Sequence, residues 1–363
     1  MIDVFLLIIN FLSLISFVYI LFILINPPKI KKEKFDKDYF PFVSIIVPAI
    51  NEEEVIERTL KKLISVDYPK KKKEIIVVSD STDRTNEICE KYKKFVKLIK
   101  HSHREGKWKA LNEGIRKAKG EIILTTDADV IVPKDWIKKL VRPFQDKTIK
   151  LTWGPGRIKN PNFNFLTKAQ TFFIDLDNIA AKISQQLEVR YAGSGSNMAF
   201  RKSVWKKYKF RNEVTEDSDF AYRIFKNGMK GYFVENAQVK IRVPLNLSDL
   251  RSQQIRWLHE SHLDLKLFLL WILFISTYLF PTLGLMTLIY LIFIKNSLLL
   301  SLFVLNIVLF VISYVLICLR TSTKNLMNGL HLISLNLFYF LFVIEAIVRM
   351  LFNSKIEWKE YKY

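Results

Sequence analysis

Residues 121–129 read Glu-Ile-Ile-Leu-Thr-Thr-Asp-Ala-Asp, an apolar run that ends in two carboxylates two positions apart. A short aliphatic run of this kind predicts a buried strand over residues 121–125. Asp127 and Asp129 then follow the carboxyl end of that strand. There they can bind one hard divalent cation, such as Mg²⁺ or Mn²⁺, and one ribose or sugar hydroxyl. An Asp-x-Asp triplet is also common in solvated turns, so its surroundings decide its meaning.

The segments upstream of this strand alternate between strand and helix patterns. The predicted strands cover residues 42–48, 73–78 and 96–100, and the predicted helices cover residues 52–65, 85–95 and 107–119, with Asn51 as the N-cap of the first helix. Strands that alternate with helices indicate βαβ units. The sequence therefore predicts an α/β, Rossmann-like fold with a mostly parallel sheet.

Polar and acidic residues follow three of these strands. The first strand leads to Asn51, the second to Asp80, and the fourth to Asp127 and Asp129. Because ligands of such sheets bind beyond the carboxyl ends of the strands, we expect these side chains to share one pocket. The chain has neither the glycine-rich dinucleotide fingerprint nor the P-loop signature, so we expect a divalent cation to hold the phosphates of a ligand.

Three further motifs follow in the C-terminal half. Gly195 belongs to a run of small residues, 193–198, that either lets the backbone approach a ligand or forms an ordinary turn. Thr215-Glu216-Asp217 precedes a helical pattern, and it either caps that helix or supplies a general base. Repulsion with nearby Asp219 should raise the pKa of at least one of these three carboxyl groups. Residues 249–266 predict an amphipathic helix at a membrane surface.

Four segments carry no Asp, Glu, Lys or Arg: residues 4–25, 267–294, 297–319 and 326–344. Each is long enough to cross a hydrocarbon layer of about 30 Å as a helix, and we predict four spans. A hairpin at Pro281 and Gly284 would give five. Residues 4–25 lack the cleavage pattern of a signal peptide and are predicted to be a retained anchor. The lysines that follow predict a multi-pass protein of the cell membrane whose central block is cytoplasmic.

The chain of 363 residues combines 50% hydrophobic residues with 56 basic and 35 acidic ones, a formal net charge of +21. This composition excludes an ordinary cytosolic protein, a disordered chain and a small disulfide-rich domain. The basic central block favours anionic lipid headgroups and a phosphate-bearing substrate as partners, and no motif predicts binding to nucleic acid. Cys89 and Cys318 predict neither a disulfide nor a zinc site.

Taken together, these motifs resemble the family 2 glycosyltransferases. The resemblance runs in order over residues 42–257, and it is strongest to the membrane-integrated branch: cellulose, chitin and hyaluronan synthases, mannan synthases and ceramide glucosyltransferases. It implies a GT-A fold in the cytoplasmic domain, with transmembrane α-helices at both ends. It also implies a nucleoside-diphosphate-sugar donor, usually UDP-linked, inversion at the anomeric carbon, and Mg²⁺ or Mn²⁺. The chain departs from the family pattern at Ser79, where an aspartate is usual, and at Ile50, where an aromatic residue is common.

The resemblance also implies roles for individual residues. Asp217 corresponds to the catalytic base, and Asp127 and Asp129 correspond to the metal-binding aspartates. The donor would be bound by Asp80, Lys107, Asp127, Gln253, Arg256 and Trp257. The acceptor side would be lined by Glu216, Gly195 and Trp257. Gln253, Arg256 and Trp257 form a Gln-x-x-Arg-Trp motif beside the membrane, where Trp257 either packs on the acceptor sugar or anchors the helix at the interface.

The predicted domains are a transmembrane anchor (1–28), a GT-A catalytic domain (29–248), the interfacial helix (249–266), C-terminal transmembrane helices (267–352) and a basic tail (353–363). We expect transfer of one sugar to a lipid-linked or saccharide acceptor, with a processive β-polysaccharide synthase as the alternative. A non-catalytic scaffold with a degenerate transferase fold is a third alternative. The sequence names neither the sugar, nor the acceptor, nor the oligomeric state.

Overall fold

The computed structural model describes residues 2–25, 35–186, 195–259 and 284–320, with a few residues between 327 and 362. The chain forms two compact units. We call residues 31–159, 180–243 and 352–363 the sheet unit, and residues 1–30, 160–179 and 244–351 the helical unit. Each unit is described by itself.

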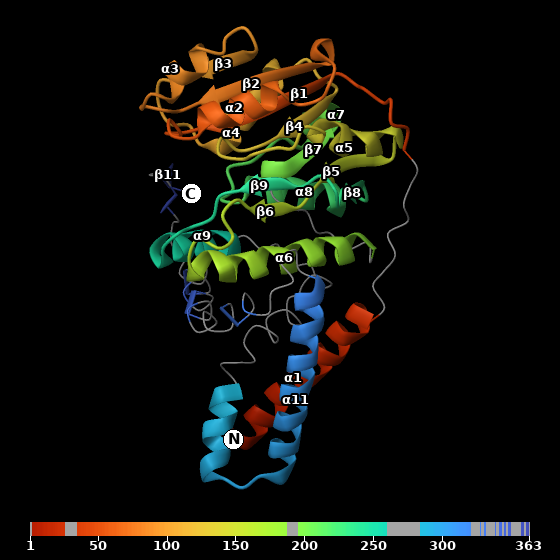
Figure 1. Cartoon of the computed structure of the whole chain (residues 1–363), viewed down its shortest axis with the longest axis vertical. Helices are drawn as coiled ribbons and strands as arrows, with labels where there is room; N and C mark the ends of the chain where they lie inside the picture. Colours follow the sequence, from red (N-terminus) through yellow and green to blue (C-terminus); the bar gives the residue numbers. More distant parts are fainter. Residues whose placement is uncertain are drawn as a thin grey trace. The chain divides into compact units, whose positions relative to one another are not determined.

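The sheet unit is built around a seven-stranded sheet in the order β3-β2-β1-β4-β7-β5-β8 (Figure 1). The strands are β1 (Val43–Ala49), β2 (Lys73–Ser79), β3 (Val96–Lys100), β4 (Ile122–Thr125), β5 (Ile149–Trp153), β7 (Met198–Arg201) and β8 (Lys230–Phe233). Neighbouring strands run parallel except at β7, which is antiparallel to both β4 and β5. The prediction of an α/β fold with a mostly parallel sheet is therefore confirmed.

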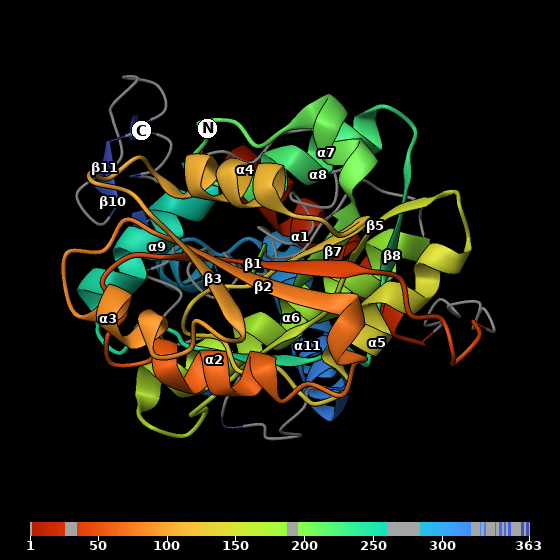
Figure 2. The same ribbon diagram turned by 90° about the horizontal axis from the view of Figure 1, so that it is seen from above.

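Two apolar clusters hold the sheet between layers of helices. Side chains of β1 alternate between them: Ile45 and Val47 belong to one cluster and Ile46 to the other, and all three are fully buried. Each such side chain contributes about 1.5–3 kcal/mol of burial free energy. The first cluster includes α2 (Ile56–Ile64), α3 (Thr85–Glu90) and α5 (Trp136–Val141), and the second includes α4 (Lys107–Lys117), α7 (Lys202–Tyr208) and α8 (Glu216–Lys226). Figure 2 shows α2 and α4 on opposite faces of the sheet.

Shorter elements complete the sheet unit. They are the parallel pair β6 (Gly156–Ile158) and β9 (Val239–Ile241), the antiparallel pair β10 (Glu357–Trp358) and β11 (Tyr361–Lys362), and the 3₁₀ turns η1 (Lys70–Lys72), η2 (Arg142–Gln145) and η3 (Gly195–Asn197). An antiparallel bridge between Ile131 and Lys240 joins β9 to the segment that follows β4.

The predicted N-cap at Asn51 is wrong. Asn51 has a φ of 50°, and α2 begins only at Ile56. The side-chain oxygen of Asn51 instead accepts the N–H of Thr82 at 2.9 Å. The N–H of Glu52 donates to the Thr85 hydroxyl at 2.8 Å. The loop after β1 is therefore hydrogen-bonded to the segment after β2, and the helix does not start at Asn51. These partners are about thirty residues away in the chain, which hides them from a local pattern.

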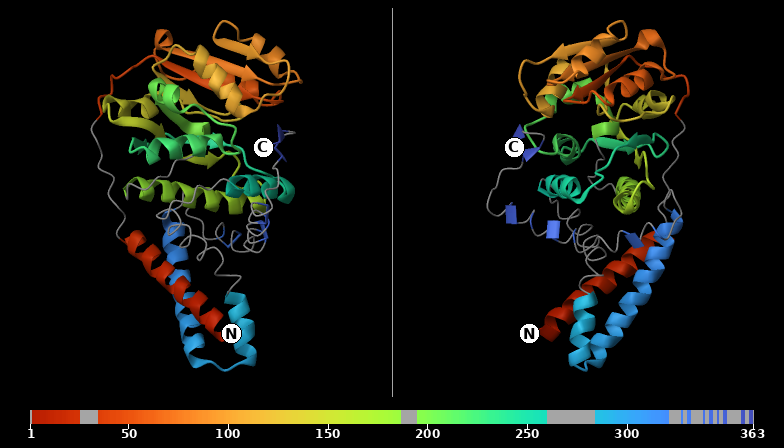
Figure 3. Two further views of the ribbon diagram at one scale, coloured as in Figure 1. Left: turned by 180° about the vertical axis from the view of Figure 1, so that it is seen from behind. Right: turned by 60° about the vertical axis from the view of Figure 1, so that its left-hand side comes forward.

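The helical unit contains α1 (Ile2–Ile25), α9 (Leu247–His259), α11 (Ser297–Arg320), a shorter helix at Gly284–Phe293, and the first part of α6 (Phe165–Gln186). Helices α1 and α11 lie side by side (Figure 3). The rings of Phe17 and Phe310 meet edge to face at 5.8 Å, and the amide of Asn306 donates to the backbone oxygen of Asn10 at 2.8 Å.

Two of the described helices are long and apolar enough to cross a membrane, Ile2–Phe22 and Ser297–Leu319. They coincide with two of the four predicted spans and support an association with a membrane. Most of residues 267–294 and 326–344 lies outside the described residues. The number of spans, four or five, therefore stays a prediction.

Candidate active site

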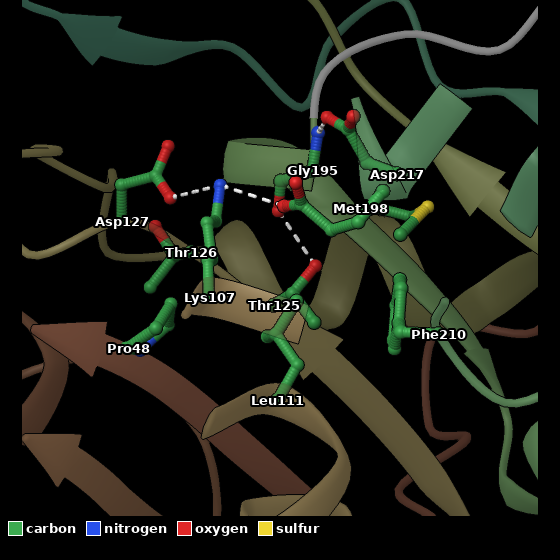
Figure 4. A pocket seen from close by; sticks show the side chains of 11 residues that line it. Pro48, Lys107, Leu111, Thr125, Thr126, Asp127, Gly195, Met198, Phe210 and Asp217 are labelled. Carbon is green, nitrogen blue, oxygen red and sulfur yellow. Dashed lines mark hydrogen bonds and ion pairs between the residues drawn. The ribbon is translucent and has the colours of Figure 1, made fainter. Parts of the chain in front are cut away.

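A pocket opens in the sheet unit beyond the carboxyl ends of β1 and β4 (Figure 4). Its lining comes from β1, the N-terminal half of α4, the end of β4 and the segment after it, η3, β7, the segment after α7 and the start of α8. The lining residues are Pro48, Lys107, Leu111, Thr125, Thr126, Asp127, Gly195, Met198, Phe210, Glu216 and Asp217. Five residues singled out from the sequence thus meet here: Lys107, Asp127, Gly195, Glu216 and Asp217.

Lys107 lies at the centre of the pocket's charges. Its Nζ atom is 3.0 Å from Asp127 Oδ1 and 3.0 Å from Glu216 Oε1. Burial alone would lower the pKa of Lys107, but the negative charges of Asp127, Glu216 and Asp217 outweigh burial and hold that pKa well above its usual range. The ammonium group therefore stays protonated and links the segment after β4 to the start of α8.

Glu216 and Asp217 are neighbours in α8 with different surroundings. Glu216 is only 4% exposed, and burial raises its pKa while the charge of Lys107 opposes that rise. Asp217 is half-buried, and its two carboxylate oxygens accept backbone N–H groups of Gly195 at 2.5 Å and of Ser218 at 2.9 Å. No side chain caps the start of α8 at Thr215, so the capping alternative for this motif finds no support.

The expected repulsion among three carboxylates involves only two of them. The third, Asp219, forms an ion pair with Arg223 at 2.6 Å, one turn further along α8. Arg223 in turn donates to the backbone oxygens of Tyr208 and Lys209, which fixes the end of α7 against α8. The prediction that at least one of the three carboxyl groups has a raised pKa is confirmed for Glu216, where burial and then the charge of Asp217 raise it, whereas Asp219 is paired with Arg223.

The backbone of Gly195 lines the pocket, as the run of small residues suggested, and the side chain that it approaches closely is that of Asp217. A Cβ atom on Gly195 would lie 2.9 Å from both the Cβ and the Oδ2 atoms of Asp217. Its carbonyl oxygen accepts the Thr125 hydroxyl at 2.6 Å, which fixes this backbone against β4. A glycine at position 195 therefore allows the carboxylate of Asp217 to sit against the main chain.

Asp80 does not line the pocket, but it supports the loop that leads to Lys107. Its Oδ2 atom accepts the N–H groups of Glu105 at 3.0 Å and of Gly106 at 3.2 Å. Its Oδ1 atom lies 2.8 Å from Nδ1 of His101, whose Nε2 lies 2.7 Å from Glu113 Oε2. Gly106 has a φ of 90°, a conformation that favours glycine, and α4 begins at the next residue.

His101 is a residue to which the sequence motifs gave no role. Burial would lower its pKa, but the hydrogen bonds to Glu113 and Asp80 outweigh burial and raise it. With a carboxylate at each ring nitrogen, the imidazolium form is the one that satisfies both contacts. His101 could have been found from its position in the sequence, because it directly follows the predicted strand at residues 96–100 and so lies at the carboxyl end of that strand.

Asp127 and Asp129 suit a divalent cation that arrives with a phosphate ligand. Among the described residues, no group of three or more His, Cys, Asp or Glu side chains is arranged to hold a metal ion. Mg²⁺ and Mn²⁺ need no such cage, because they commonly bind one or two carboxylates and take their other ligands from substrate phosphates and water. The carboxylate of Asp127 faces the pocket, and Asp129 is half-buried two residues further on.

Gln253, Arg256 and Trp257 lie on α9 in the helical unit. Leu250, Gln254 and Ile255 are buried on this helix, whereas Trp257 is 37% exposed. The Trp257 ring stacks on Phe173 of α6, with ring centroids 6.4 Å apart and an angle of 17° between the planes. The helix predicted at residues 249–266 is thus observed as far as His259, and its place at a membrane surface stays a prediction. The part from 260 onward lies outside the described residues.

Comparison with solved structures identifies the fold. A mannosyltransferase from Pyrobaculum calidifontis superposes with a TM-score of 0.67 over 96% of this chain and 99% of its own, at 20% sequence identity. Together with the order of the strands and the position of the Asp-x-Asp segment, this similarity defines the sheet unit as a GT-A fold, the class that the sequence predicted.

The family follows from the sequence. Residues 44–209 match the family model described as Glycosyl transferase family 2, and the chain therefore contains a family 2 glycosyltransferase domain. The poly-β-1,6-N-acetyl-D-glucosamine synthase of Staphylococcus epidermidis is 30% identical over 230 residues, which is 61% of this chain and 54% of that protein. The probable glycosyltransferase YdaM of Bacillus subtilis is 31% identical over 60% of this chain. The chain spans about half the length of these relatives.

Proposed function

We propose that the protein is a membrane-bound, inverting glycosyltransferase. It moves a sugar from a nucleoside diphosphate, with UDP as our first choice, to a hydroxyl of a lipid-linked or saccharide acceptor. The observation that supports this proposal best is the convergence of Lys107, Asp127, Glu216 and Asp217 on one pocket at the carboxyl ends of the parallel strands. The family match supplies the reaction class.

The reaction makes two demands on this pocket: the leaving diphosphate gains negative charge, and an acceptor hydroxyl is a poor nucleophile. Lys107 supplies a permanent positive charge for the diphosphate. A divalent cation held by Asp127 and Asp129 would stabilise the same charge. Asp217 is our candidate base, because its carboxylate lines the pocket in a fixed orientation and Glu216 is occupied by Lys107. A positioned base contributes about 10²–10⁴-fold to the rate.

The remaining assignments depend on the family resemblance. We propose that Asp80 contributes to the nucleoside side of the donor site, and that Gln253, Arg256 and Trp257 act on the diphosphate and the acceptor. Arginine suits the diphosphate because its planar fork matches phosphate oxygens. The mannosyltransferase with the same fold was solved with GDP-Man and Mn²⁺, which supports a nucleotide-sugar donor and a divalent cation. We also propose that the catalytic domain lies on the cytoplasmic side of a multi-pass membrane protein.

A second candidate function is a processive polysaccharide synthase. It is favoured by the staphylococcal relatives, which are named poly-β-1,6-N-acetyl-D-glucosamine synthases. The two candidates differ in the product: one added sugar in the first case and a polymer in the second. Incubating the purified full chain with a panel of labelled nucleotide sugars, Mg²⁺ or Mn²⁺ and candidate acceptors, and then sizing the product, separates them.

The variant Asp217→Asn tests the assigned base. We expect transfer to fall by about 10²–10⁴-fold, while donor binding, measured as ligand-induced thermal stabilisation, persists. Ser218→Ala is the matched control, because Ser218 is exposed and only its backbone N–H contacts Asp217. Normal turnover by Asp217→Asn would remove Asp217 from the mechanism. Equal losses in both variants would show that the start of α8, and not the carboxylate, is what matters.

A further inference from the structure

The outer face of the small β6–β9 sheet is strongly basic. The two strands run parallel, with Arg157 opposite Lys240 and Ile158 opposite Ile241, and the N–H of Lys159 donates to the Ile241 oxygen at 3.0 Å (Figure 1). Because successive side chains in a strand point to opposite faces, residues 157, 159, 240 and 242 share one face. We call this set the cationic face; its members are Arg157, Lys159, Lys240 and Arg242.

The opposite face of the same two strands packs into the protein core. Val239 and Ile158 are 1% and 8% exposed, and Ile241 packs against the first apolar cluster. This packing fixes the register, since a slip by one residue would exchange the apolar and basic faces. The basic side chains are therefore directed outward by the fold of the sheet unit.

Within the described residues, three of the four members of the cationic face have no carboxylate partner. Among the described residues, no carboxylate lies within 4.0 Å of Lys159, Lys240 or Arg242. Partial burial and then the positive charges of Arg58, Arg242 and Lys240 lower the pKa of Lys159, so these groups repel one another at close range. Glu235 partly offsets Arg157, but it also pairs with Lys182 at 2.9 Å.

Arg58 of α2 adds a partly buried guanidinium to this set. Its Nε atom and one terminal nitrogen are shielded from solvent, and no hydrogen-bond acceptor in the described part of the chain reaches either of them. Buried donors of a charged group are costly when they are left unpaired, and in native structures they nearly always have a partner. An anion such as a phosphate group would satisfy these donors of Arg58 and screen its basic neighbours.

The course of the chain indicates the source of that anion. The sheet unit passes into the helical unit directly after residue 159 and again after residue 243, at the same end of the two parallel strands. The helical unit carries both candidate membrane spans. We propose that the cationic face and Arg58 bind the phosphate groups of anionic lipid headgroups at the membrane surface. The bridge between Lys240 and Ile131 connects this contact to the segment that carries Asp127 and Asp129.

Amide hydrogen exchange of the full chain in lipid nanodiscs tests the proposal. Exchange at residues 156–159 and 239–242 is compared between nanodiscs of zwitterionic lipid and nanodiscs that also contain an anionic phospholipid. Each basic side chain close to an anionic surface changes binding by about fivefold. We expect anionic lipid to slow exchange in β6 and β9, and about 1 M salt, where the Debye length is about 3 Å, to abolish the difference.

The variant Lys240→Ser/Arg242→Ser should reduce the effect of anionic lipid by up to about 25-fold, the product of two such factors. Its matched control is Lys71→Ser/Lys94→Ser, which removes the same charge from two other exposed positions of the sheet unit and should keep the full effect. Unchanged exchange in β1 and β2 shows that both variants are folded.

Two kinds of result would overturn the proposal. Equal exchange in the two lipid compositions, or an equal loss in the control variant, would exclude a specific contact with anionic lipid. The same slowing in zwitterionic nanodiscs supplied with inorganic phosphate would assign the site to a free anion instead of a lipid surface. The readout is independent of sugar transfer, so its failure would leave the proposed enzymatic function untouched.

Discussion

Replacing Gly195 with alanine tests whether the position of Asp217 controls transfer. The new Cβ would lie 2.9 Å from the Cβ and Oδ2 atoms of Asp217, and an ordinary contact needs about 3.4 Å. The Gly195 backbone is held by the hydroxyl of Thr125, so the side chain of Asp217 has to move, by about 0.5 Å. Because a 1 Å misplacement can lower a rate by about 10²-fold, we expect a loss of about tenfold in kcat.

The assay measures kcat, the KM for the donor and the midpoint of thermal unfolding for the same preparation. Overpacking in a tight site lowers the free energy of unfolding by about 1–3 kcal/mol. The variant is therefore compared with a control in which the added Cβ atom also makes a close contact. Gly156→Ala serves as that control, since its Cβ would meet only the flexible side chain of Ile241, at 3.0 Å. If Gly195→Ala kept full kcat while losing stability like the control, the proposed dependence on the placement of Asp217 would be refuted.

Three further predictions concern protonation, the core and the metal. Because the pKa of His101 is raised in the fold, its protonated ring stabilises the protein fully below about pH 6.5, the pKa of the unfolded chain, and this contribution is lost as pH rises through the raised pKa. The midpoint of thermal unfolding of His101→Gln should lack that part of the pH dependence. Asn197→Ala should lower the unfolding free energy in urea by about 2 kcal/mol or more, because it leaves the Trp136 indole N–H and the Ala237 carbonyl unpaired, each worth about 1–3 kcal/mol. EDTA should abolish transfer, and Mg²⁺ or Mn²⁺ should restore it, with no change in the unfolding midpoint of the donor-free protein; full activity in EDTA would remove the cation from the mechanism.

The strands of the sheet were predictable because burial dictates their composition. The predicted strand at residues 96–100 matches β3, and the aliphatic run before Asp127 is β4. The helix boundaries were less predictable. The helix expected over residues 85–95 ends at Glu90, and Phe95 is 59% exposed. A local pattern does not show that the chain turns back early to enter β3.

The membership of the pocket was also partly predictable. Parallel topology brings the carboxyl ends of strands together, which is why Asp127 could be expected beside the other site residues. The ion pairs of Lys107 with Asp127 and Glu216 could not be predicted, because they depend on how three separate segments fold against one another. The contacts of Asp80 with the Glu105 and Gly106 backbone are of the same kind, since only the folded loop creates those N–H positions.

The charge balance of the pocket bears on how the donor enters. Three carboxyl groups, of Asp127, Glu216 and Asp217, face the ammonium group of Lys107, and that ammonium already pairs with two of them. A bare diphosphate entering this pocket would meet repulsion from the carboxylates and would have to compete with them for Lys107. Asp127 would hold a divalent cation whose charge would compensate the carboxylate, and Lys107 would then be left to the phosphate oxygens. Metal should therefore be required for donor binding as well as for catalysis. Donor-induced thermal stabilisation of equal size with and without Mg²⁺ or Mn²⁺ would contradict this electrostatic account.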